Sequence, residues 1–245
     1  MISWKVTTYG RVSTLEETLF SFLNQDDLTD CEMVIVNDYS LQELVFDNPQ
    51  VRIFNFKETF KTIGDKENFV VEQCRGDIIA VTDDDDVYMS NHNTNIKKYF
   101  TNGTNILHWK KGVFYNKPNI TNIVSIGNSG MVYSKEAWLK VGKHPIMNAG
   151  GDSDFAAKVH SLGNVVHASP PDSEISAWYR WGGMGYHQSG MGHDVPGRPN
   201  IIERHSRHIE GLRRAGKIPT GVIHLKPKWN QPYDKMLQEF IKKKR

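Results

Sequence analysis

Four consecutive carboxylates, at residues 83–86, have the clearest capacity for chemistry in this 245-residue chain. They follow Ile78–Val81, an apolar run that is typical of a buried strand. In an extended chain alternate side chains share a face, so Asp83 and Asp85 would project together, about 6.6 Å apart. Two such charges repel by about 2.5 kcal/mol at an effective dielectric constant of about 20. A cation at the strand end would relieve this repulsion, and carboxylate oxygens favour Mg²⁺, Mn²⁺ or Ca²⁺ over zinc or copper.

The acidic run has two other interpretations. Most charge runs are solvated turns, but a buried strand leads directly into this one. A helix–loop–helix calcium site is excluded, because the fifth, sixth and twelfth positions counted from Asp83 are Val87, Tyr88 and Thr94. Such a loop requires an oxygen ligand, a glycine and a glutamate at those positions. A divalent-metal site at the end of a sheet strand is therefore the favoured interpretation.

The surrounding pattern predicts the elements that would position these carboxylates. Strands are expected over 3–9, 31–36, 51–56 and 76–82, with helices over 14–24 and 66–74. Ser13, with Glu16 completing a capping box, and Asp65 are the expected caps of the two helices. Alternation of strands and helices predicts an α/β fold built on a mostly parallel, Rossmann-type sheet with helices on both faces.

Ligands of such sheets bind beyond the carboxyl ends of the strands. Residues 8–11, Asp38 and residues 83–86 each follow a predicted strand, so we expect them to be neighbours. Neither G-x-G-x-x-G nor G-x-x-x-x-G-K-[ST] is present. A nucleotide bound here would therefore have its phosphates held by a metal rather than by a glycine loop.

The composition is that of a globular protein, with 38% hydrophobic and 11% aromatic residues. No run approaches eighteen apolar residues, so no transmembrane helix is expected. Residues 1–5 lead directly into a strand and lack the features of a signal peptide. The two cysteines, Cys31 and Cys74, are too few for a disulfide framework and lack zinc-like spacing. The cytoplasm is the expected location.

Three segments in this order resemble the nucleotide-sugar glycosyltransferases of the GT-A fold, particularly family 2. They are residues 8–11, residues 34–40, and residues 76–79 leading into Asp83-x-Asp85-Asp86. The resemblance covers roughly the first hundred residues. It implies a GT-A-like fold, a nucleotide-sugar donor and a divalent metal, Mn²⁺ or Mg²⁺.

The resemblance also implies roles for individual residues of the donor site. In that family the residue matching Asp38 binds the nucleobase, usually uracil, so a UDP-sugar is the expected donor. The residues matching Asp83 and Asp85 meet the ribose and the diphosphate-bound metal, with Asp85 as the expected direct ligand. Lys66 and Asn68 fall where the family often has an Arg-Asn pair, although both could lie on a helix surface. The donor site would comprise Thr8, Tyr9, Gly10, Arg11, Asp38, Lys66, Asn68, Asp83 and Asp84.

The second half is expected to form the acceptor side, with strands over 105–110 and 123–134 around a turn at 127–130. Residues 148–154 then open a helix. The family usually carries Glu-Asp here, with the Asp acting as base in inverting members. This sequence departs from that pattern, with Gly151 at the Glu position and Asp152 at the Asp position. Asp152 is the predicted base, a helix N-cap is its alternative role, and Asp154 is the second candidate base.

Residues 178–193, rich in glycine and aromatic residues, are predicted to form a loop that closes over ligand. In many GT-A enzymes a histidine from this region completes the metal shell. The resemblance therefore implies His187 as the metal ligand beside Asp83 and Asp85, with His193 second. A solvent-exposed loop histidine is the alternative.

These predictions divide the chain into a nucleotide-sugar-binding half (1–102), an acceptor half with the catalytic helix and glycine-rich loop (103–197), and a basic helical extension (198–245). The extension holds thirteen Lys/Arg against four Asp/Glu. Its net charge is +9, which leaves −7 on residues 1–197 in a chain of net charge +2. Helices are expected over 200–215 and 233–243.

The basic extension favours a polyanionic partner. DNA glucosyltransferases of GT-A type that act on hydroxymethylated pyrimidines form a known class, and a DNA acceptor suits the charge. An apolar stripe over 233–241 could instead dock on an anionic membrane beside a lipid-linked acceptor. A helix packed on its own domain is the third alternative. DNA is preferred over the membrane because the arginines that would contact phosphates precede the stripe: Arg204, Arg207, Arg213 and Arg214.

The leading hypothesis is a metal-dependent transfer of a sugar from a nucleoside diphosphate to an acceptor hydroxyl, with inversion. A lipid-linked or free saccharide is the alternative acceptor, and a binding module without activity is a further possibility. A phosphohydrolase of the haloacid-dehalogenase type is the rival enzyme class, since Asp83-x-Asp85-x-Val87 matches its nucleophile strand. In that family, however, the nucleophile strand is the first strand of its domain, whereas three predicted strands precede the strand over 76–82 in this chain.

Overall fold

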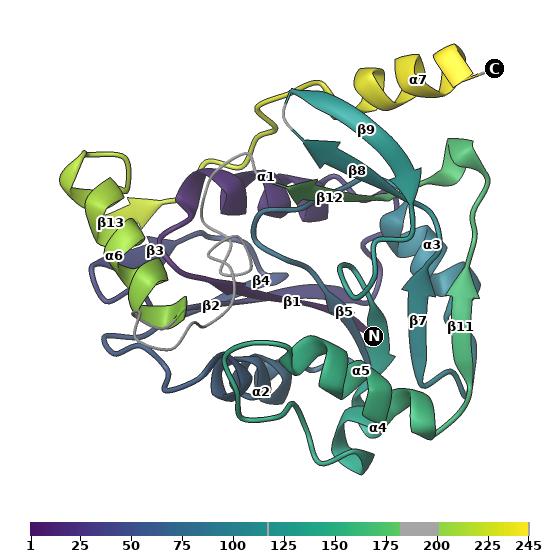
Figure 1. Cartoon of the computed structure of the whole chain (residues 1–245), viewed down its shortest axis with the longest axis horizontal. Coiled ribbons are helices and arrows are strands. Elements are labelled where there is room, and N and C mark those ends of the chain that lie inside the picture. Colours follow the sequence, from purple (N-terminus) through teal and green to yellow (C-terminus); the bar gives the residue numbers. More distant parts are fainter. Residues whose placement is uncertain (117, 182–200, 245) are drawn as a thin grey trace.

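The computed structural model describes residues 1–116, 118–181 and 201–244. Its centre is a seven-stranded sheet with the order β11-β7-β10-β5-β1-β2-β4 (Figure 1). Strands β4, β2, β1 and β5 are parallel, β10 is antiparallel to β5 and β7, and β11 is parallel to β7. The strands are β1 (Ile2–Thr8), β2 (Cys31–Asn37), β4 (Val51–Asn55), β5 (Ile78–Val81), β7 (Ile106–Trp109), β10 (Val132–Ser134) and β11 (Val165–Ala168).

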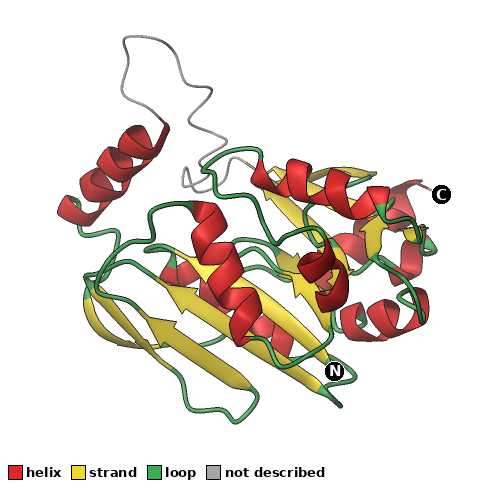
Figure 2. Ribbon diagram, turned by 90° about the horizontal axis from the view of Figure 1, so that it is seen from below, coloured by secondary structure: helices red, strands yellow, loops and turns green. Residues whose placement is uncertain are grey.

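Alternation along the strands gives this sheet two apolar faces. In β2, Met33 and Ile35 join one core cluster, whereas Val34 and Val36 join another. The first cluster is covered by α1 (Val12–Leu23) and α3 (His92–Tyr99). The second is covered by α2 (Ile63–Gln73), α4 (Lys135–Lys140) and α5 (Gly151–Ser161), which lie together on the other face (Figures 1 and 2). The predicted α/β fold with a mostly parallel sheet and helices on both faces is confirmed.

A second sheet, of order β6-β12-β8-β9, packs beside the first (Figure 1). Its strands are β6 (Val87–Tyr88), β12 (Ala177–Trp181), β8 (Gly112–Asn116) and β9 (Asn119–Val124). The turn predicted at 127–130 lies between β9 and β10, where Ser129 N is bonded to Ile126 O at 3.2 Å. The segment predicted over 123–134 therefore holds only the end of β9 and the whole of β10, since residues 125–131 are not strand. The loop predicted from residue 178 was wrong at its start, since residues 178–181 belong to β12.

Both predicted helix caps were wrong. Helix α1 begins at Val12 with no side-chain cap, and Glu16 instead accepts a hydrogen bond from Lys226 N at 2.7 Å. Helix α2 is capped by Thr62, whose hydroxyl accepts from Asp65 N at 3.0 Å and donates to the Asp65 carboxylate at 2.8 Å. Asp65 therefore supports the cap from inside the first turn rather than forming it.

The basic extension forms α6 (Ile201–Arg214), β13 (Gly221–His224) and α7 (Tyr233–Lys244). Strand β13 pairs in parallel with β3 (Gln42–Val45), so strand pairing links residues 198–245 to the first part of the chain. A short 3₁₀ helix, Asp172–Glu174, precedes β12. In the described ranges no helix combines the length and apolar character that crossing a bilayer requires.

The apolar stripe of α7 packs on the second sheet. Tyr233 and Leu237 are buried in a cluster with Val113 and Trp178, and Met236 is partly buried against it. This packing favours the third alternative for the stripe, a helix docked on its own domain, over a free membrane-binding face.

Replacing Leu237 should therefore destabilise the whole domain. We expect Leu237→Ala to lower the free energy of unfolding by about 2–4 kcal/mol, since it removes a buried side chain and leaves a cavity. Leu139→Ala, the same change on a helix where the side chain is 58% exposed, should cost less than about 0.5 kcal/mol. Urea denaturation measures both. Equal, small losses would show that α7 adds nothing to the core.

Candidate active site

The cavity of interest lies at the carboxyl ends of the central strands. Strand β1 pairs in parallel with β2 and with β5, so the loops that follow these three strands emerge at one edge. Together with the amino-terminal ends of α2 and α5, they border a cavity of about 750 Å³. The expected convergence of the three polar segments is therefore present.

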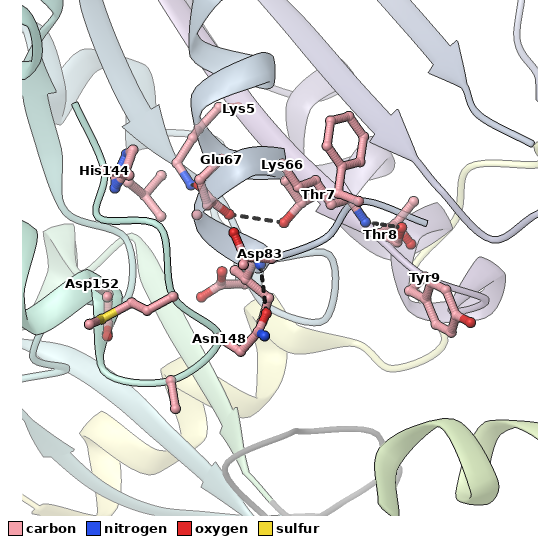
Figure 3. A pocket seen from close by; sticks show the side chains of 18 of the residues that line it. Lys5, Thr7, Thr8, Tyr9, Lys66, Glu67, Asp83, His144, Asn148 and Asp152 are labelled. Atoms are coloured by element: carbon pink, nitrogen blue, oxygen red, sulfur yellow. Dashed lines mark hydrogen bonds and ion pairs between the residues drawn. The ribbon is translucent and has the colours of Figure 1, made fainter. Parts of the chain in front are cut away.

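The residues predicted from the sequence divide into two groups. Those that line the cavity are Thr8, Tyr9, Arg11, Asp38, Lys66, Asp83, Asp85 and Asp152. Those that do not line it are Gly10, Asn68, Asp84 and Asp154. Figure 3 shows Asp83 and Asp152 at the same cavity, the first after β5 and the second from the start of α5. His187 and His193 lie outside the described residues.

The acidic run forms a turn, with Asp86 N bonded to Asp83 O at 3.2 Å, rather than an extended strand end. Its side chains nevertheless alternate in environment. Asp84 and Asp86 are buried and do not line the cavity, whereas Asp83 and Asp85 do. The Asp86 carboxylate accepts hydrogen bonds from the Ser129 hydroxyl at 2.5 Å and from Arg180 N at 2.9 Å. Asp84 and Asp86 thus anchor the turn, and the other two carboxylates face the ligand space.

The electrostatics of the run show a shortage of positive charge. Burial, reinforced by Asp85, raises the pKa of Asp83 to about 7. Burial and Asp85 also hold the pKa of Asp86 well above its ordinary value. Burial raises the pKa of Asp84, although Arg11 opposes the rise. For Arg11, burial lowers the pKa, but Asp84 and Asp85 outweigh it and raise the pKa above its usual value.

The donor set at the turn fits a hard divalent cation. Among the described residues, no three His, Cys, Asp or Glu side chains converge closely enough to hold an ion by themselves. Mg²⁺ and Mn²⁺ sites in nucleotide enzymes use one or two carboxylates and take further oxygens from substrate phosphates and water. Asp83 and Asp85, crowded and facing the cavity, match that arrangement.

Asp38 and Lys66 form a buried ion pair at the wall nearest β2. One Asp38 oxygen contacts Lys66 Nζ and the other accepts from Phe60 N at 3.0 Å. Lys66 Nζ also donates to Thr8 O at 2.7 Å. Burial lowers the pKa of Lys66, and Asp38 opposes the fall. The helix-surface alternative for Lys66 is therefore wrong, because its ammonium group lies inside the site.

Asn68 has a different position from its predicted one. Its amide nitrogen donates to His144 O at 3.0 Å, and its oxygen accepts from His144 N at 2.8 Å and from Trp138 Nε1 at 3.2 Å. These bonds fasten the segment that leads into α5. Asn68 thus supports the cavity wall from behind and does not itself line the cavity.

Tyr9 connects the cavity with the basic extension. Its ring packs against Tyr39 at 5.0 Å and lies 6.2 Å from the ring of His205 in α6. His205 and Ser206 themselves line the cavity. Gly10 makes the turn after Tyr9 possible, since its φ of 75° is strained for residues with a side chain.

The start of α5 distinguishes the two candidate bases. Gly150 is the N-cap, in a left-handed conformation with φ of 73°, and no side chain caps this helix. The N-cap alternative for Asp152 is therefore wrong, and its carboxylate lies in the first turn, facing the cavity. Asp154 lies 3.7 Å from Lys158, on the exposed side of the helix. The geometry favours Asp152 as the base.

The sequence did not predict two sets of contacts, one centred on Lys5 and the other on Arg180. Lys5 and Glu67 form an ion pair that lines the cavity, and Thr7 donates to Glu67 at 3.1 Å (Figure 3). The position of Lys5 within an apolar strand is the feature of the sequence that could have indicated this pair. Arg180 donates to Asp85 O and to Glu17, and no local pattern in the sequence indicated these contacts.

Comparison with known proteins agrees with this fold. The chain has the GT-A fold, as do solved glycosyltransferase structures that resemble it. A structure of S. aureus TarS 1-349 in complex with UDP-GlcNAc has a TM-score of 0.60 at 16% identity, over 98% of this chain and 71% of that one. The mannosyltransferase PcManGT from Pyrobaculum calidifontis, in complex with GDP-Man and Mn²⁺, has a TM-score of 0.57 at 16% identity, over 97% and 68%.

A further S. aureus TarS 1-349 structure has a TM-score of 0.56 at 16% identity and is matched over 73% of this chain and 60% of its own length. The chain thus spans about three fifths of that relative. No curated protein matches the sequence significantly. The sequence profile of glycosyl transferase family 2 matches residues 3–142, more than half of the chain. The chain belongs to glycosyl transferase family 2.

The Asp38–Lys66 pair should be important for stability. Asp38→Asn leaves the buried Lys66 without its counter-charge, so we expect the free energy of unfolding to fall by about 3–5 kcal/mol. Because burial lowers the pKa of Lys66 in the folded state, the unfolded chain binds more protons, and stability should recover as the pH rises toward 10.5.

Glu43→Gln is the matched control, because Glu43 and Lys57 form an exposed pair at 3.7 Å. Such a pair contributes less than about 1 kcal/mol. Denaturation of both variants at several pH values is the measurement. An Asp38→Asn protein as stable as the control would contradict the ion pair.

Proposed function

We propose that this protein transfers a sugar from a nucleoside diphosphate, with uridine as the nucleoside, to an acceptor hydroxyl with inversion of configuration. The observation that carries the proposal is a single cavity lined by Asp38, by Asp83 and Asp85, and by Asp152. Its volume of about 750 Å³ is in the range of small-molecule sites. Membership of glycosyl transferase family 2 supports the same reaction class.

The wall formed by Asp38, Lys66 and Tyr9 suits the nucleoside. A carboxylate and an ammonium group side by side offer an acceptor and a donor to the polar edge of a base. Tyr9 adds an aromatic surface. The relatives solved with UDP-GlcNAc and with GDP-Man support a nucleoside diphosphate sugar. The resemblance of Asp38 to the uracil-binding residue of the family favours uridine.

Asp83 and Asp85 would hold Mn²⁺ or Mg²⁺, which when bound offsets the charge that develops on the departing diphosphate. The Mn²⁺ of the related mannosyltransferase structure supports this choice. His187 stays the predicted third ligand. Asp152 accepts the proton of the acceptor hydroxyl. At the same time the hydroxyl oxygen forms a bond to the sugar carbon, and the bond from that carbon to the diphosphate breaks. Asp152 also orients the hydroxyl, since it faces the cavity from a helix start.

A panel of nucleotide sugars, tested with Mn²⁺ and with EDTA, separates the proposal from its rivals. Turnover of a sugar nucleotide supports glycosyl transfer, turnover of phosphate esters would favour the phosphohydrolase, and binding alone would favour an inactive module. Family membership favours the first result.

Asp152→Asn should reduce transfer by at least a hundredfold and leave the KM for donor nearly unchanged, because it removes a proton acceptor without changing shape. Asp154→Asn, the same change on the side of α5 away from the cavity, should alter transfer only a few-fold. Steady-state kinetics with the best donor of the panel is the measurement. If only Asp154→Asn abolishes transfer, Asp154 is the base. If neither does, the inverting mechanism is wrong.

The acceptor is proposed to be a hydroxymethylated pyrimidine in DNA, on the strength of the basic extension. In this extension Arg213 and Arg214 contact Glu210 at 2.6 and 2.9 Å. Exposed pairs of this kind are weak and can be exchanged for phosphates. The packing of α7 leaves less apolar surface for a membrane, so the lipid-linked acceptor is the second choice.

Binding measured against salt concentration tests the acceptor. DNA contact predicts a steep fall of oligonucleotide affinity with salt, and neutralising the four arginines of α6 should flatten that slope. Binding to anionic vesicles instead, lost in Phe240→Ser, would favour the lipid-linked acceptor. Binding to neither would leave a free saccharide as the acceptor.

A further inference from the structure

The guanidinium group of Arg11 lies on the acidic turn where the proposed function requires a metal. Its Nε donates to Asp84 at 3.0 Å, and Nη2 contacts the second oxygen of the same carboxylate. Its Nη1 lies 2.7 Å from Asp85 Oδ2. One arginine thus bridges two carboxylates of the run, holding the first at both oxygens and the second at one.

The two carboxylates differ in what they face. The side chain of Asp84 has no exposed surface and does not line the cavity. The side chains of Asp85 and Arg11 both line it. The contact with Asp84 is therefore an anchor buried in the protein, whereas the contact with Asp85 is open to ligands. Arg11 can lose the second contact and keep the first.

A divalent ion and Arg11 compete for the same carboxylate, that of Asp85. The preferred metal ligand on the turn is Asp85, and one of its carboxylate oxygens already contacts a full positive charge. A second cation placed there would be repelled by the first, by several kcal/mol at 4 Å and an effective dielectric constant of about 20. The neighbouring lysines cannot take the place of Arg11 beside Asp85, because each already has its own counter-charge. Lys5 is paired with Glu67, and Lys66 is paired with Asp38.

We propose that Arg11 is the counter-cation of Asp85 in the donor-free protein and yields this place to the divalent ion when the diphosphate arrives. Asp84 keeps Arg11 anchored at the cavity wall during the exchange. The released N–H groups of Arg11 then bind a phosphate oxygen of the donor, a geometry for which arginine is well suited. This inference rests on the proposed function, and it makes metal binding depend strongly on the nucleotide.

The test measures Mn²⁺ binding by electron paramagnetic resonance, with and without UDP. Arg11→Gln is combined with Asp84→Asn, so that neither member of the buried pair is left alone. Without UDP, this double variant should bind Mn²⁺ at least tenfold more tightly than the wild type. The factor by which UDP improves Mn²⁺ affinity should be at least tenfold smaller in the variant, because the arginine that links the two ligands is gone.

Two further proteins control the result. Arg11→Lys keeps a positive charge on Asp84, but an ammonium group lacks the planar fork that holds both oxygens of Asp84 while reaching Asp85, so its Mn²⁺ affinity without UDP should also exceed that of the wild type. Arg75→Gln removes the same charge from an exposed residue before β5, at the end of the strand opposite the acidic turn. Its Mn²⁺ affinity should equal that of the wild type.

Different failures have different meanings. Unchanged or weaker Mn²⁺ binding in both Arg11 variants, with UDP-dependent Mn²⁺ binding intact in the wild type, overturns the exchange and leaves the proposed function standing. Absence of Mn²⁺ binding in every protein, even with UDP, overturns the metal-dependent function and the exchange with it. Sugar transfer that continues in EDTA and requires Arg11 would show that the arginine replaces the metal, which also overturns the exchange.

Discussion

The structure depends on the electrostatic cost of placing four carboxylates at the end of a buried strand. Asp84, Asp85 and Asp86 are buried, so the protein supplies much of the compensation itself. Arg11 comes from the turn after β1, Ser129 from the turn before β10, and Arg180 from β12. Each of these contacts joins a separate element to the acidic turn. The packing of the second sheet against the first therefore has an electrostatic reason besides its apolar one.

Arg180 extends this compensation to the carboxyl-terminal part of the chain. Its guanidinium contacts the buried Glu17 of α1 and lies 3.0 Å from the Tyr233 hydroxyl. Tyr233 in turn donates to Glu17 at 3.0 Å. Because Arg180 Nε also donates to the backbone carbonyl of Asp85, a chain of hydrogen bonds connects the start of α7 with the backbone of the residue that would bind the metal. The basic extension is thus connected to the candidate site and is not an independent tail.

Much of the donor side could be predicted from the sequence, because local patterns determine it. Buried strands read directly as apolar runs, and parallel pairing brings their carboxyl ends together, so Asp38 and Asp85 were expected at one edge. Contacts between distant segments left no such pattern. The position of Arg180 depends on Glu17, which is distant in the sequence. The cap of α2 was predicted at Asp65 instead of Thr62, and these two side chains are hydrogen-bonded to each other. The prediction of Asp152 as the base came from the resemblance alone, since its own neighbours give no local signal.

The charges of the cavity limit what can enter it. Among the described lining residues, four are cationic and five anionic: Lys5, Arg11, Lys61 and Lys66 against Asp38, Glu67, Asp83, Asp85 and Asp152. A diphosphate adds further negative charge, so a bound cation is needed to hold it close to Asp85. A polyanionic acceptor meets the same barrier. Its phosphates would have to lie outside the cavity, along the basic residues of α6, while a single neutral hydroxyl reaches Asp152.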